Sequence, residues 1–125
     1  MWRKSCWCVL AVFLSAISVN LVLAVSINEV MPHSNNSLGD EWIEIYNNEN
    51  LEINLTNWKI GDISSNDTIN LTISAGGFAI ITNDNINCTS FSVSNKSCFE
   101  LATIGSGLND DDEKIYLYDN SSNII

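Results

Sequence analysis

From residue 25 onward, apolar and polar residues alternate with a period of two and not with the period of a helix. Residues 41–47 give the clearest case. One face of this segment carries Ile43 and Ile45, and the other carries Trp42, Glu44 and Tyr46. Because successive strand side chains point to opposite faces, such alternation predicts a half-buried β-strand. Residues 78–82 are almost continuously apolar and predict a strand buried on both faces.

The same period predicts further short strands at residues 27–31, 51–55, 58–60, 69–73 and 114–118. Between them stand clusters of Asn, Asp, Ser and Gly, which favour turns because these residues accept unusual backbone angles. The clusters are residues 47–50, 64–67, 76–77, 109–112 and 120–123. Short strands separated by regular turns are typical of β-sandwiches and barrels. No segment predicts a helix, so we expect an all-β domain.

Residues 1–24 have a different character. Arg3 and Lys4 precede an apolar run from Val9 to Ala24 that ends in small residues. This arrangement predicts a signal peptide cleaved after residue 24. An uncleaved N-terminal anchor is the alternative, although the run is shorter than the ~20 residues that usually span a bilayer. In both cases residues 25–125 are expected to form one secreted or cell-surface domain, with no membrane contact beyond the leader.

Composition narrows the class of partner. The chain has 125 residues, of which 15 are acidic and 5 basic, and its formal net charge is −10. Without Arg3 and Lys4, three lysines face the 15 acidic residues, which gives −12. Such a charge argues against nucleic-acid binding and against adsorption to anionic lipid, because both need a basic surface.

Cysteines and sequons agree with export. Cys88 and Cys98 are the two cysteines outside the leader, and an even pair in an exported chain predicts a disulfide. Seven N-x-S/T sequons are candidate N-glycosylation sites, at Asn35, Asn54, Asn66, Asn70, Asn87, Asn95 and Asn120. Asn54 and Asn70 alternate with apolar residues of expected strands, so both are predicted to face solvent.

Taken in order, the motifs of residues 26–125 resemble the lamin-tail domain, an immunoglobulin-like module that also occurs in secreted prokaryotic and archaeal proteins. The matching segments are INEVMP (27–32), DEWIEIYN (40–47), LTNWKIGD (55–62), ISAGGFAII (73–81) and LNDDDEKIYLYD (108–119). The resemblance implies an immunoglobulin-like β-sandwich. The residues are compatible with it, since Ile43 and Ile45 would enter the core, with Trp58 as a large central aromatic. Residues 83–103 look like an insertion, and the family pattern continues with a further strand after Asp119.

Catalytic patterns are missing from the sequence. The single histidine, His33, lies in a Pro/Asn/Ser-rich stretch, and Gly105-Ser106-Gly107 lacks the spacing of a nucleophile elbow. Carboxylate pairs such as Glu41 and Glu44 are expected to be solvated surface charges. The acidic turn could offer calcium the oxygen ligands that it prefers. The candidate ligands there are Asp110, Asp112 and Glu113. An Asx-rich loop without metal is the alternative, and we expect no other cofactor and no enzyme.

We therefore expect a non-catalytic binding or tethering module, with a protein or glycan as its partner. Trp42, Glu44 and Tyr46 form the candidate recognition face, because Trp and Tyr supply contact area at low entropic cost. Alternatively, Trp42 packs under a neighbouring loop and leaves the other two side chains solvated. Other hypotheses are an accessory domain of a longer secreted hydrolase or nuclease, and a carbohydrate-binding module.

The C-terminal residues predict the beginning of one more strand. Residues 120–123 favour a turn, and Ile124-Ile125 would start a returning strand. Two residues are shorter than the 5–6 of a typical strand, so we expect a fragment that lacks its last strand. Strand-sharing at this C-terminal edge, with a partner or a second copy, is the alternative, as is coverage of the edge by residues 83–103.

Overall fold

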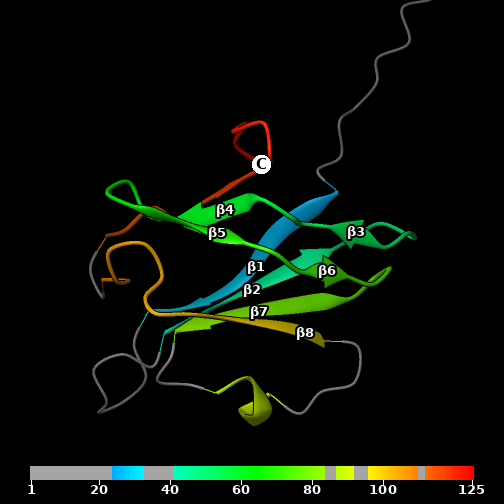
Figure 1. Ribbon diagram of the computed structural model, residues 1–125, viewed down its shortest axis with the longest axis horizontal. Coiled ribbons are helices and arrows are strands. Elements are labelled where there is room, and N and C mark those ends of the chain that lie inside the picture. Colours follow the sequence, from blue (N-terminus) through cyan, green and yellow to red (C-terminus); the bar gives the residue numbers. More distant parts are fainter. Residues whose placement is uncertain (1–23, 33–40, 84–86, 92–95, 110–111) are drawn as a thin grey trace, which may run out of the picture.

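The computed structural model describes residues 24–32, 41–83, 87–91, 96–109 and 112–125, and it shows the expected all-β, immunoglobulin-like sandwich (Figure 1). One layer is a four-stranded sheet in the order β1-β2-β7-β8. Its strands are β1 (Val25–Met31), β2 (Trp42–Asn47), β7 (Phe78–Asn83) and β8 (Lys96–Leu101). The predicted leader lies outside the described residues.

Two smaller sheets, β5-β4-β9 and β3-β6, form the second layer. Their strands are β3 (Ile53–Asn54), β4 (Trp58–Gly61), β5 (Asn66–Ile69), β6 (Thr72–Ile73) and β9 (Tyr116–Tyr118). A short 3-10 helix, η1 (Cys88–Ser90), lies on the side of the four-stranded sheet that faces away from the second layer (Figure 1). Within the described residues, no helix has the length and apolarity needed to cross a membrane.

The core fills the space between the layers with aliphatic side chains. Ile43 and Ile45 are fully buried there, as the alternation in residues 41–47 predicted. The second layer contributes Leu55, Ile60, Ile69, Ile73 and Leu117, which are all at most 2% exposed. Trp58 is only partly buried and packs against the margin of this cluster, so its expected central position was wrong. Branched aliphatic residues already occupy the centre.

Two strands were not predicted. β5 covers residues that the Asn/Asp/Ser cluster had assigned to a turn, and Ile69 is its one buried residue. β8 falls within residues 83–103 and contains no fully buried residue. β5 has Ile69 as its one apolar residue and β8 lacks regular burial, so neither shows a period-two hydrophobic pattern, and backbone pairing with β4 and β7 defines these strands. Residues 69–73 are not one strand, because Ile69 and Ile73 belong to different sheets.

Asn47 ends β2 and ties the two layers together. Its side chain is fully buried, and its amide nitrogen donates to the carbonyl oxygens of Leu51 at 2.8 Å, Ser74 at 3.0 Å and Ile73 at 3.2 Å. Its Oδ1 accepts from the backbone N–H of Glu49 at 3.0 Å. This one carboxamide therefore fixes the turn after β2 and the end of β6 against the four-stranded sheet.

Asp62 plays a similar part at the β4–β5 turn. Its Oδ1 accepts from the N–H groups of Ser64 and Ser65, and its Oδ2 accepts from the N–H and the hydroxyl of Ser106. Burial raises the pKa of this carboxyl, but the hydrogen bonds from Ser106, Ser65 and Ser64 outweigh it and lower the pKa from 3.8 to about 2. Gly105 lies so close that a Cβ there would stand 2.8 Å from Asp62 Oδ2.

The C-terminal residues return along β9, as their sequence predicted. Ile124 pairs with Tyr118 in an antiparallel bridge, and the N–H of Ile125 donates to the carbonyl of Leu117 at 2.9 Å. Asp119 closes the turn by accepting hydrogen bonds from the N–H groups of Ser121 and Asn123. Strand-sharing at this edge remains a prediction.

Asn47→Ala is expected to lower the free energy of unfolding by about 2–4 kcal/mol, because it removes four hydrogen bonds, one of them to the buried carbonyl of Ile73. Asn48→Ala is the control, since the Asn48 side chain is exposed, and it should stay within about 0.5 kcal/mol of wild type. Urea denaturation of both variants measures the difference. Equal effects at the two positions would contradict this role of Asn47.

Asp62→Asn should remove a pH-dependent part of the stability. The pKa is depressed in the folded state, so the stabilisation is complete above about pH 4 and is lost as the pH falls through 2. We expect wild type to exceed the variant by on the order of 2 kcal/mol at pH 6, with the gap shrinking toward pH 2. Urea midpoints at pH 6, 4, 3 and 2 measure it. Ser106→Ala removes the hydroxyl donor to Asp62, and its stability should fall between those of wild type and Asp62→Asn. A stability difference between wild type and Asp62→Asn that stayed constant with pH would refute the depressed pKa of Asp62.

Candidate binding face

The outer face is the surface of the four-stranded sheet that points away from the core. By strand register it comprises Trp42, Glu44 and Tyr46 of β2, Phe78, Ile80 and Thr82 of β7, and Lys96, Cys98 and Glu100 of β8. The structure thus places the three predicted recognition residues side by side on one face. Ile80, at the centre of this face, is only 1% exposed although it points away from the core cluster. Neighbouring side chains and segments therefore cover the middle of the outer face.

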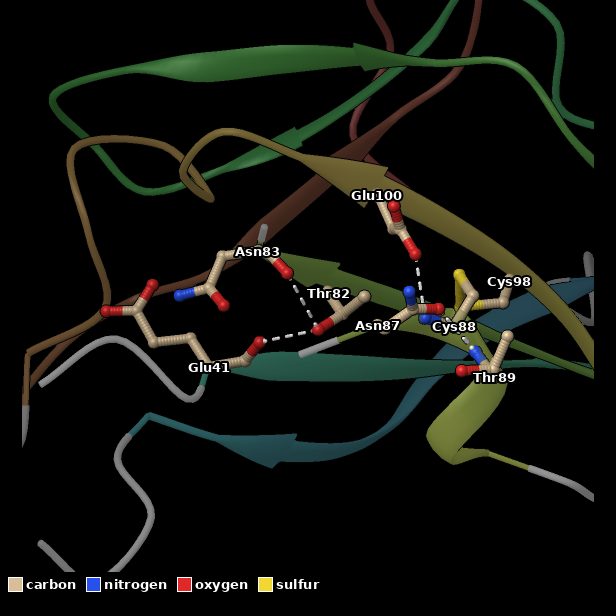
Figure 2. Close-up of a disulfide and its surroundings, with 8 residues drawn as sticks. All are labelled: Glu41, Thr82, Asn83, Asn87, Cys88, Thr89, Cys98 and Glu100. Carbon is tan, nitrogen blue, oxygen red and sulfur yellow. Dashed lines mark hydrogen bonds between the residues drawn. A yellow bond between two sulfur atoms is a disulfide. The ribbon is translucent and has the colours of Figure 1, made fainter. Parts of the chain in front are cut away.

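One end of the outer face is capped by η1. The predicted disulfide is present, and it joins Cys88 of η1 to Cys98 of β8 (Figure 2). The backbone N–H of Cys88 also donates to Glu100 Oε1 at 2.7 Å. Just beyond η1, Phe91 meets Trp42 edge to face with the ring centroids 6.2 Å apart. Trp42 thus packs under a loop, as the alternative interpretation of this residue expected.

The other end carries a more open group that we call the Tyr46 cluster, made of Asn28, Glu44, Tyr46, Phe78 and Lys96. The rings of Tyr46 and Phe78 pack with their centroids 4.7 Å apart, and the Lys96 ammonium lies 5.5 Å from the centre of the Phe78 ring. Lys96 also forms an ion pair with Glu44 Oε2 at 2.5 Å. Two aromatic side chains and a charged pair are therefore held in fixed positions at the surface.

Glu44 is not solvated, in contrast to the alternative interpretation of this face, because its side chain is only 8% exposed. In the β1–β2 ladder it lies opposite Glu29, and like charges in that position destabilise a sheet. A β-bulge at Asn28 relieves this repulsion, since the amide of Asn28 donates to Glu44 Oε1 at 2.7 Å. Lys96 supplies the opposite charge from the far side, so both carboxylate oxygens have partners.

Glu41 is also buried, so the expectation of two solvated carboxylates was wrong. Its Oε1 accepts from the backbone N–H of Leu108 at 3.0 Å, and its carbonyl accepts from the Thr82 hydroxyl and the Asn83 N–H. Figure 2 shows this group at the start of β2. Glu41 thereby anchors the segment that leads to β9, which is a structural role.

Sequence reasoning missed Phe78, Phe91 and Lys96. Phe78 was assigned to a fully buried strand, and the other two lay in the supposed insertion. Lys96 did carry a usable signal, because it is one of three lysines outside the leader. In a chain with 15 acidic residues, each of these three lysines has many carboxylates available as ion-pair partners.

The predicted modification and metal sites fall elsewhere. Asn54, Asn66, Asn70 and Asn120 are exposed and belong to the second layer or its turns, whereas Asn87 caps η1. Asn35 and Asn95 lie outside the described residues, as do His33 and Asp110. Asp112 is exposed, and the Glu113 carboxylate accepts hydrogen bonds from the backbone and side chain of Asn109. In the described part of the chain no three His, Cys, Asp or Glu residues gather as a metal site, and calcium binding stays a prediction.

A comparison with protein families finds a match to the family described as Lamin Tail Domain over residues 22–125. This match covers every described residue, including the whole outer face and the second layer. A comparison with curated proteins finds no match.

The double variant Cys88→Ser/Cys98→Ser should detach η1 from β8, so that η1 no longer covers one end of the outer face. The chain-entropy estimate for a bridge between residues 10 apart is about 2–3 kcal/mol, so a drop of that size in the free energy of unfolding is expected. In residues 25–125 with Trp58→Phe, where Trp42 is the one tryptophan left, its fluorescence should shift to the red as Phe91 moves away. Chemical reduction of the parent protein provides the matched control. An unchanged stability and spectrum would show that the disulfide does not hold η1 in place.

Proposed function

Since the chain belongs to the lamin tail domain family, we propose that it is a non-catalytic, exported binding or tethering module. The Tyr46 cluster is the observation that supports this proposal best. Tyr46 and Phe78 are only partly buried, and they offer apolar contact area that is already fixed in place. Side chains that are ordered before binding lose little entropy on contact, which favours recognition.

The proposed partner is a protein surface and not a sugar. Sugars usually stack on an open aromatic face, but the Phe78 ring is engaged by Tyr46 and by the Lys96 ammonium. A protein partner can instead pack against the exposed edges of both rings and reach the ion pair beside them. Glu44 and Lys96 then supply a fixed acceptor and donor, which would give orientation more than affinity.

The disulfide and the distribution of sequons support export. Disulfides persist mainly in oxidising compartments, and this one joins two segments of the same domain. Four of the five described sequons lie on the second layer, away from the Tyr46 cluster. Glycans at those positions would cover the far side of the sandwich and leave the cluster accessible. The proposed orientation therefore has the outer face toward the partner.

The double variant Tyr46→Ala/Phe78→Ala should weaken binding to isolated envelopes of the source cell by at least tenfold, which corresponds to about 1.4 kcal/mol. Tyr116→Ala/Tyr118→Ala is the matched control, because it removes a neighbouring aromatic pair, with ring centroids 6.0 Å apart, from the second layer. Sedimentation of the labelled protein with the envelopes, as a function of concentration, gives both affinities.

Each variant must first show a cooperative thermal transition, so that loss of binding is not loss of fold. The control is expected to bind like wild type. Equal weakening by both double variants, or none by the first, would contradict the proposed placement. Binding that a glycan array reproduces with isolated sugars would replace the protein partner by a carbohydrate.

A further inference from the structure

A second surface, independent of the Tyr46 cluster, lies where the two layers separate along β1. It is a groove of about 460 Å³. Its lining residues are Ile27, Val30 and Pro32 on one side and Leu108, Asn109, Glu113 and Ile115 on the other. Ile27 and Val30 stand opposite the core residues Ile45 and Ile43, so both point toward the second layer. The groove is therefore an apolar opening that leads to the margin of the core.

One wall of this groove is an edge strand. Among the described strands, β1 pairs with β2 alone and ends the four-stranded sheet. Apart from the bulge at Asn28, its other edge thus presents backbone N–H and C=O groups along the seven residues of β1, which matches the length of a typical strand. A peptide that pairs there in extended form places every second side chain toward the groove.

Charge limits what can occupy the groove. Glu29 of β1 is exposed, and Asp112 and Glu113 lie on the opposite wall or beside it. Among residues 112–115, Lys114 is the one basic residue. The whole chain carries −10, so a second copy would bring its own negative charge to an acidic rim. A basic chain is attracted to the same rim.

We propose that β1 and the groove bind an extended peptide segment of a partner protein by strand addition. The bound segment carries apolar side chains at alternate positions and Lys or Arg between them. Backbone hydrogen bonds to β1 provide affinity, and the apolar side chains fill the space beside Ile27, Val30 and Ile115. Because successive strand side chains point to opposite faces, the basic side chains lie on the outer side of β1, near Glu29.

Two fluorescent decapeptides test this inference, one alternating Val with Lys and the other alternating Val with Glu. Fluorescence anisotropy with the purified protein should show binding of the Val/Lys peptide at least tenfold tighter than that of the Val/Glu peptide. Saturation with the Val/Lys peptide should slow amide hydrogen exchange along β1. Attraction by charge alone would leave that exchange unchanged, and this outcome would overturn strand addition.

Variants locate the site. Ile115→Asp should weaken binding of the Val/Lys peptide at least tenfold, whereas Ile53→Asp should not. Ile53 is the matched control because it is equally half-buried and packs on the same core outside the groove. If either variant fails to melt cooperatively, the rim variant Glu29→Gln, which changes only an exposed charge of β1, should weaken binding about threefold or more. Wild-type affinity in Ile115→Asp, or in the rim variant, would refute the site.

Discussion

The joining of the two layers depends on polar side chains at the ends of one strand. At the end of β2, the buried carboxamide of Asn47 holds the carbonyls of Leu51, Ile73 and Ser74. Just before β2 begins, the carboxylate of Glu41 holds the N–H of Leu108. Between these two points, Ile43 and Ile45 fill the core. A segment of seven residues thus supplies both the apolar centre and the polar ties that keep the layers aligned.

The same segment shows why part of the structure could be predicted and part could not. Ile43 and Ile45 are identified as core residues by alternation, which depends only on neighbours in the sequence. Glu44 is on the outer face by the same rule, but its burial depends on Lys96, which lies 52 residues away. Glu41 is buried through Leu108, 67 residues away. Local pattern gives the direction of a side chain, whereas its partner depends on how distant segments pair.

The strands that sequence missed follow the same logic. β8 is an edge strand in a parallel pair with β7, and one of its faces is covered by η1. Its residues alternate in neither hydropathy nor burial, so no periodic signal marks it. The cysteine pair nevertheless located the segment correctly, because a covalent bond requires no periodicity. With Phe91 and Lys96 in this segment, the supposed insertion proved to contain a strand of the sheet and part of the candidate face.

The topology of the four-stranded sheet has a consequence for how the chain comes together. β1 and β2 are made early, and an isolated strand pair is at best marginally stable in water. Their next neighbour, β7, follows only after residues 48–77, which supply most of the second layer. Closing a loop of this length costs conformational entropy. The contacts that offset this cost form only when the core and the sheet form together. During synthesis from the N-terminus, the four-stranded sheet therefore cannot be completed until β7 and β8 have been made.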